Sequence, residues 1–126
     1  MYQYVVRTDI EDEKIFSAIS EISQDLQRLQ NEVDAFVVLE VSPAINCVNY
    51  MQAANLSEAK GLFKKRQVVT GYTIEINLTE KDGSLKQYQY MTKDFEEIKG
   101  MLVDYASHLR IPDFSAWADV SKLYFG

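Results

Sequence analysis

The sequence predicts a single α+β domain in which two amphipathic helices cover one face of a sheet. Two stretches, 15–33 and 95–109, carry apolar residues at alternating steps of three and four, which places those side chains along one side of a helix. Between them, residues 72–79 alternate apolar and polar side chains, the period of a half-buried strand. The expected element order is β-α-β-β-β-β-α. The sheet is expected to have four to five strands, mostly antiparallel or mixed.

The N-terminal part is expected to form a strand and then a long helix. Tyrosine and valine favour a strand at 2–7. Thr8 and Glu11 form the Ser/Thr-x-x-Glu pattern that satisfies amides at a helix start, so a helix is expected from about 10 to 31. The apolar run 35–41 then predicts a central strand covered on both faces.

The middle of the chain predicts two strands joined by a basic excursion. The first strand is expected at 45–53, with Cys47 buried and inert at its centre, since free cysteine is usually buried. Residues 55–67 are expected to form a lysine-rich loop or a single helical turn. A further strand is expected at 68–79, with an irregularity at Gly71.

The C-terminal part predicts a hairpin and the second helix. Asp82-Gly83 suits a tight turn, and the return strand is expected at 85–91. Thr92 or Asp94 is expected to cap the helix, which should end before the proline at position 112.

One domain spanning 1–126 is expected, because no repeat, low-complexity tract or linker divides the chain. Residues 113–126 are rich in apolar side chains, so we expect this segment to pack back on the domain.

Composition favours a cytoplasmic protein. The net charge is −6, which argues against binding to nucleic acid, since phosphate neutralisation needs a basic surface. No run approaches the roughly 18 apolar residues of a membrane span, and the N-terminus turns acidic too soon for a secretory signal. The single cysteine cannot form an intramolecular disulfide, as is typical of a reducing compartment.

No motif indicates a catalytic, cofactor or metal site. The five glycines form no phosphate-binding loop, and one histidine with one cysteine cannot build a typical zinc site. Glu40 and Glu75 lie in apolar, strand-like surroundings and are the remaining acid–base candidates. Both are expected to project from the exposed face of the sheet. The sequence therefore assigns no catalytic residue, no cofactor and no metal ligand, and it favours a protein that is not an enzyme.

Two groups of residues are candidates for contacts with a partner. Tyrosine is enriched at protein interfaces, and tyrosines concentrate in the predicted strands. The candidate interaction surface comprises Tyr72, Glu75, Tyr88, Gln89 and Tyr90. The candidate basic loop comprises Lys60, Lys64, Lys65 and Arg66. The first group is expected to share the open face of the sheet, and the second is expected to be a mobile arm.

The leading hypothesis is a protein-binding module without catalytic activity, whose protein partner the sequence does not identify. Small size, acidic charge, an α/β layout and the lack of catalytic motifs resemble the bacterial immunity proteins that neutralise partner toxins. One alternative is a small-molecule-binding or catalytic domain with a pocket between sheet and helix, lined by Asn49, Gln52 and Glu75. Another is a structural homodimer that pairs through sheet faces or edges.

Overall fold

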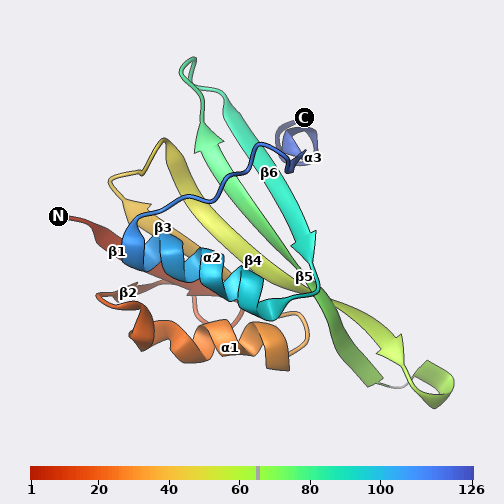
Figure 1. The fold of residues 1–126 in the computed structure, drawn as a ribbon. Helices are drawn as coiled ribbons and strands as arrows, with labels where there is room; N and C mark the ends of the chain where they lie inside the picture. Colours follow the sequence, from red (N-terminus) through yellow and green to blue (C-terminus); the bar gives the residue numbers. More distant parts are fainter. Residues whose placement is uncertain (65) are drawn as a thin grey trace.

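One antiparallel sheet dominates the structure, a computed structural model that describes residues 1–64 and 66–126. Seven strands among the described residues pair in the order β2-β1-β3-β4-β5-β6-β7 (Figure 1). Their bounds are β1 (Gln3–Thr8), β2 (Lys14–Phe16), β3 (Phe36–Ser42), β4 (Val48–Lys60), β5 (Arg66–Thr79), β6 (Leu85–Thr92) and β7 (Ala118–Asp119). The α+β class is confirmed, but the expected layout of four to five strands is wrong.

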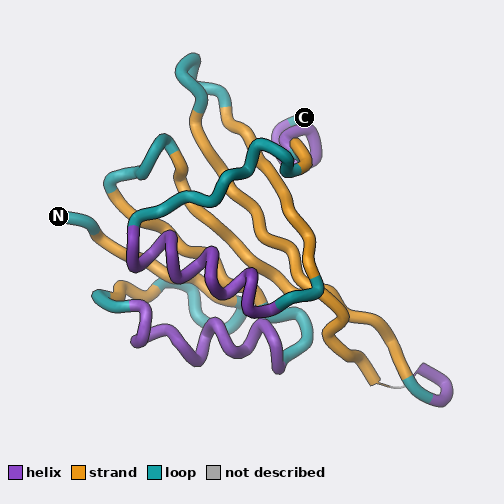
Figure 2. The backbone as a smooth tube through the Cα atoms, in the orientation of Figure 1, coloured by secondary structure: helices purple, strands orange, loops and turns teal. Residues whose placement is uncertain are grey.

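Helices α1 (Ser23–Asn31) and α2 (Phe95–His108) lie side by side on one face of the sheet (Figure 2). We call the opposite side of the sheet the far face. A short helix, α3 (Ser121–Phe125), ends the chain, and two 3-10 turns, η1 (Ile19–Ile22) and η2 (Leu62–Lys64), complete the described helices.

The core lies between these two helices and the sheet. Buried side chains of η1, α1 and α2 contribute to one apolar cluster with the inward side chains of β3, β4 and β5. The helical members are Ile22, Leu26, Leu29, Phe95, Ile98, Leu102, Tyr105 and Ala106. Each buried aliphatic side chain contributes about 1.5–3 kcal/mol, so this cluster is the main source of stability.

The prediction of a long helix over 10–31 is wrong for the N-terminal half of that range. The Thr8 hydroxyl does accept bonds from the amides of Ile10 (3.3 Å) and Glu11 (3.0 Å), as a helix cap would. However, the Thr8 amide donates to the Glu11 carbonyl (2.8 Å), which closes a turn instead. The chain then pairs back on β1, with Ile15 opposite Val5. The cap motif therefore builds the β1–β2 connection, and helical structure begins only at η1.

Strand β3 is covered on one face only, so the prediction that both faces would be covered is wrong. Val37, Leu39 and Val41 are buried toward the helices, while Val38 and Glu40 between them are partly exposed. The difference arises because α1 and α2 both pack on the same side of the sheet.

The C-terminal segment wraps around the edge of the sheet at β6. Helix α2 ends at His108, and the next residue, Leu109, adopts a left-handed conformation (φ 53°). The chain then crosses the sheet and adds β7 beside β6, with Asp119 opposite Tyr88. The Ser121 hydroxyl of α3 accepts a bond from the Gln87 amide (2.9 Å). Residues 113–126 thus pack on the rest of the protein.

Strands β4 and β5 extend beyond the rest of the sheet as a two-stranded hairpin, which we call the arm (residues 55–71; Figure 1). Two antiparallel strands make up most of its described part, although the sequence predicted a loop or a single helical turn over 55–67, and the short 3-10 turn η2 lies at its tip. The register shifts between Leu56 and Ser57, which leaves Thr70 as an extra residue beside Gly71. The predicted irregularity at Gly71 is therefore confirmed.

Cys47 is exposed, so its expected burial is wrong. It lies in a tight turn between β3 and β4, where Asn46 (φ 49°) and Cys47 (φ 66°) are left-handed and the Val48 amide bonds the Ile45 carbonyl (2.9 Å). The strand accordingly starts at Val48 and not at Ile45.

This position makes the thiol testable. We expect a maleimide reagent to label Cys47 completely in the folded protein, at the rate of a solvent-exposed thiol and without loss of structure. Mass spectrometry over a time course under native and denaturing conditions checks this. Labelling only after denaturation would contradict the exposed turn.

Candidate interaction surface

The tyrosines and polar residues of the first candidate group lie on opposite faces of the sheet. In the β5–β6 register, Tyr88 is opposite Ile76 and Tyr90 is opposite Ile74, so both tyrosines share the helix side with those core residues. Glu75 is paired with Gln89 on the far face. Because neighbouring residues of a strand point to opposite faces, these side chains do not form one surface.

The three tyrosines of this group contact other parts of the chain. Tyr72 packs against Phe95 (ring centroids 5.7 Å apart), and burial raises the pKa of its hydroxyl. Tyr88 contacts Phe114 (5.2 Å), and Tyr90 stacks on Trp117 (5.5 Å, 18° between planes). Tyr72 therefore helps to attach α2 to the sheet, whereas Tyr88 and Tyr90 attach the C-terminal segment.

The hydroxyl of Tyr90 has a further internal contact. It lies 3.0 Å from both carboxylate oxygens of Glu97 in α2. This hydrogen bond is the main reason why the pKa of Tyr90 is raised.

Glu75 is the centre of a polar cluster on the far face. Its side chain is only 5% exposed. Its Oε1 accepts bonds from the amides of Gln52 (3.1 Å) and Gln87 (2.8 Å), and its Oε2 accepts one from Gln89 (2.8 Å). The pKa of Tyr124 in α3 is raised to about 12, by burial and then by its hydrogen bond with Glu75. The carboxylate is thus surrounded by neutral donors and partly covered by α3.

These contacts bear on the proposed small-molecule pocket. Gln52 and Glu75 lie on the side of the sheet away from α1 and α2, and each is hydrogen-bonded within the cluster. Asn49 donates to Asn77 (2.8 Å) and Thr79 (2.9 Å). All three residues expected to line a pocket between sheet and helix are therefore hydrogen-bonded to other side chains of the protein.

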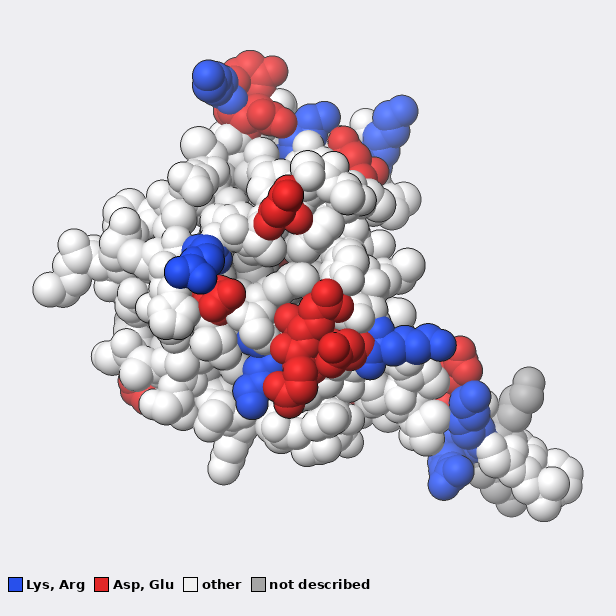
Figure 3. Space-filling view, in the orientation of Figure 1, with Lys and Arg blue, Asp and Glu red and all other residues white. Residues whose placement is uncertain are grey.

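The arm carries the second candidate group. Lys60 and Arg66 face each other across the hairpin, close to its tip. Lys65 lies outside the described residues, as does the side chain of Lys64. At the tip, Leu62 and Phe63 are 80% and 78% exposed. Figure 3 shows the cationic side chains projecting with the arm from the body of the protein.

A groove of about 610 Å³ lies at the base of the arm. It is lined by Leu56, Glu58, Lys60, Thr70, Gly71, Met91, Thr92 and Lys93. Leu56 and Met91 supply partly exposed apolar walls, 42% and 62% exposed. A Cβ atom at Gly71 would lie 3.4 Å from the Thr92 carbonyl oxygen. Because glycine has no side chain, this part of the groove stays open.

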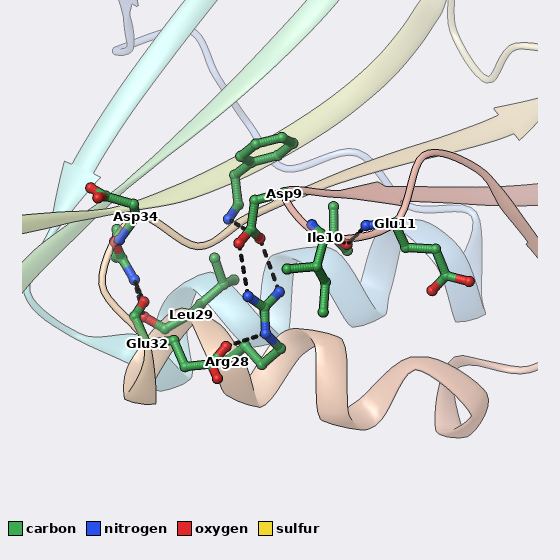
Figure 4. A network of polar contacts seen from close by, with 10 residues as sticks. Asp9, Ile10, Glu11, Arg28, Leu29, Glu32 and Asp34 are labelled. Atoms are coloured by element: carbon green, nitrogen blue, oxygen red, sulfur yellow. Dashed lines mark hydrogen bonds and ion pairs between the residues drawn. The ribbon is translucent and has the colours of Figure 1, made fainter.

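The root of the arm is fixed to the end of α1 (Figure 4). The Asn55 side-chain amide donates to the carbonyls of Leu29 (2.9 Å) and Glu32 (2.5 Å), and its oxygen accepts from the Asp34 amide (3.1 Å). These are carbonyls that a helix end leaves without intrahelical partners. The arm is thus attached to the body at its base.

An ion-pair network supports the same corner (Figure 4). Arg28 donates to both carboxylate oxygens of Asp9 (2.9 and 2.8 Å) and also pairs with Glu32. Asp9 accepts a further bond from the Phe36 amide (3.2 Å). The hydrogen bond with Arg28 is the main cause that lowers the pKa of Asp9 to about 2. This network ties α1 to the β1–β2 turn and to the start of β3.

Sequence reasoning located the basic residues of the arm but missed its apolar ones. Leu62 and Phe63 were detectable, because adjacent large apolar residues in a stretch rich in lysine and arginine are unusual. Leu56 and Met91 were not, because they approach each other only through the β4–β5–β6 pairing and the shift beside Gly71.

No family model, curated protein or solved structure matches this chain. Among the described residues, none of the helices combines the length and apolar character that a bilayer crossing requires. In that same part of the chain, no group of three or more His, Cys, Asp or Glu residues is placed to hold a metal ion.

Proposed function

We propose that this protein is a protein-binding module without catalytic activity, and that it contacts an acidic protein partner through the arm and its groove. The observation that carries the proposal is the exposure of Leu62 and Phe63 at the end of a basic projection. Large apolar side chains grouped on a surface mark sites of association, and aromatic residues are enriched in such sites.

Charge supports an acidic partner. The arm holds four of the thirteen Lys and Arg residues of the chain but only one of its nineteen Asp and Glu residues. The rest of the protein would therefore repel an acidic partner while the arm attracts it. Such asymmetry orients an encounter and raises its rate more than it raises the final affinity.

The attachment of the arm supports the same proposal. Asn55 fixes its root through three hydrogen bonds, so a partner would meet an element whose direction is already set. A preorganised element loses less conformational entropy on binding than a flexible loop does.

The immunity-type role is a specific form of this proposal. It requires that the acidic partner be a toxin of the same bacterium, that the complex form in the cytoplasm, and that binding block the toxin's activity. The basic arm would then contact an acidic surface of the toxin.

Charge reversal on the arm tests the proposal. We expect Lys60→Glu with Arg66→Glu to weaken partner binding at least about tenfold and to reduce its salt dependence. The matched control, Lys81→Glu with Lys122→Glu, makes the same change in net charge at exposed positions outside the arm. The measurement is crosslinking from position 62 in the native host, followed by titration of the captured partner at several salt concentrations.

Two results would contradict the proposal. One is equal binding by the arm and control variants. The other is crosslinking only to a second copy of the chain, together with a dimer in light scattering, which would favour the structural homodimer.

A further inference from the structure

We propose that the partner presents an extended acidic segment that joins the sheet as a strand along the outer edge of β5, in line with β6. This inference rests on the proposed function and specifies how the arm is used.

Along the arm, β5 has a strand partner on only one side among the described residues. β4 pairs with β5 from Arg66 onward, but β6 pairs with it only from Tyr72 to Thr79. At Thr92 the chain turns from β6 toward the cap of α2 at Asp94. Among the described residues, no strand pairs with 66–71 on that side. An edge of this kind offers backbone donors and acceptors to an added strand.

The groove lies where the side chains of that strand would point. Alternate residues of a strand face the same side about 6.6 Å apart. A strand beside 66–71 would direct every second side chain toward the far face, between Leu56 and Met91. Apolar residues fit these walls, and Gly71 leaves space above the floor.

The charges around the groove select the chemistry of the occupant. Lys60 and Lys93 line it, Arg66 lies at the outer end of the edge, and Glu58 is the one acidic residue among the described lining residues. Glu58 is already paired with Lys60 (3.3 Å). Lys60 and Leu56 lie on the same face of β4, and Arg66 is opposite Lys60, so the cations and the apolar walls share the groove face. The complementary segment therefore carries both apolar residues and aspartate or glutamate on the side that faces the groove.

A synthetic peptide tests this geometry without knowledge of the partner. The probe is a peptide of about eight residues in which leucine and glutamate take turns at every second position, so that both face the groove, with threonine at the positions between them. Three controls accompany it: the same peptide with alternate backbone amides N-methylated, a scrambled sequence, and a version with lysine in place of glutamate. Binding is followed by fluorescence anisotropy, and hydrogen exchange of the protein amides locates the contact.

We expect the probe to bind and to slow hydrogen exchange over 66–71. N-methylation is expected to weaken binding at least about tenfold, because it removes the backbone donors that pair strands. Gly71→Val should weaken binding similarly by filling the groove, while Gly100→Val, an exposed glycine with open space around it, should not. Met91→Glu, on an exposed wall, serves as a second groove variant should Gly71→Val fail to fold.

Several outcomes would overturn the strand-addition inference. They are lack of binding by the probe, equal binding by the N-methylated peptide, protection outside 66–71, or pairing of this edge with a second copy in the peptide-free protein. If the arm charge reversal still abolishes partner binding in any of these cases, the proposed function stands and only the mode of contact is wrong. If the charge reversal has no effect, the proposed function itself fails.

Discussion

Replacing Ile22 by aspartate is expected to unfold the protein, whereas the same change at Ile15 leaves it folded. Ile22 is fully buried in the core cluster, and Ile15 is 65% exposed on β2. An unpaired charge or an unbonded polar group in a core costs several kcal/mol, which is comparable to the roughly 5–15 kcal/mol that stabilises a small domain. Urea denaturation followed by circular dichroism measures both variants.

The pair of variants also tests the structure of the N-terminal region. The two isoleucines occupy the same apolar stripe in the sequence, so a long helix over 10–31 predicts comparable damage from both changes. Cooperative unfolding of Ile22→Asp near the wild-type urea midpoint would show that this stripe does not face the core. Severe destabilisation by Ile15→Asp would contradict the assignment of β2.

This stripe shows where sequence reasoning succeeded and where it stopped. Periodicity identified Ile22, Leu26 and Leu29 correctly, because burial against the sheet requires that spacing. It could not show that Ile15 leaves the helix, since a strand pairing with β1 is a tertiary contact. The Thr8 motif was equally ambiguous, because a hydroxyl that accepts nearby amides can cap a helix or close a turn.

The hairpin between β5 and β6 was the most predictable part of the fold. Alternation along 72–79 and the Asp82-Gly83 turn both depend on local geometry. The structure confirms the strand and the turn, where Gly83 has φ 87° and the Glu80 amide bonds the Ser84 carbonyl (2.8 Å). The expected half-burial is wrong, because Glu75 and Asn77 on the polar face are also buried. Which face each tyrosine would occupy relative to α3 and the C-terminal segment was not predictable. That outcome depends on the route of the last fourteen residues around the sheet edge.

The candidate surface, too, was predictable only where it depends on the local sequence. Charge located the basic stretch, because charge is a property of the sequence alone. The groove depends on three strands and on a register shift at Leu56, and no local pattern encodes that combination. Only the structure shows that the apolar walls and the unpaired edge lie beside the basic residues of the arm.

Removing the guanidinium of Arg28 is expected to destabilise the protein by about 2 kcal/mol at pH 7. Arg28→Ala eliminates two charge-assisted hydrogen bonds to Asp9 and the pair with Glu32, while alanine preserves helix propensity. The side chains of Arg28 and Asp9 are 17% and 22% exposed, so solvent screens this pair only in part. The melting temperature should fall by about 8 °C, and Arg110→Ala, an exposed arginine after α2, should change it little.

The pH dependence tests how much of this stability comes from the charge of Asp9. Its folded pKa of about 2 lies below its ordinary value of 3.8, so the unfolded state binds more protons in this range. The Asp9 contribution is complete above the unfolded pKa and is lost as pH falls through the folded value near 2. In Arg28→Ala the pKa of Asp9 should return toward 3.8, so the difference from wild type should shrink as the pH is lowered from 5 to 2. A difference that stays constant over this range would mean that Arg28 stabilises the fold through packing of its aliphatic stem, and not through its charge.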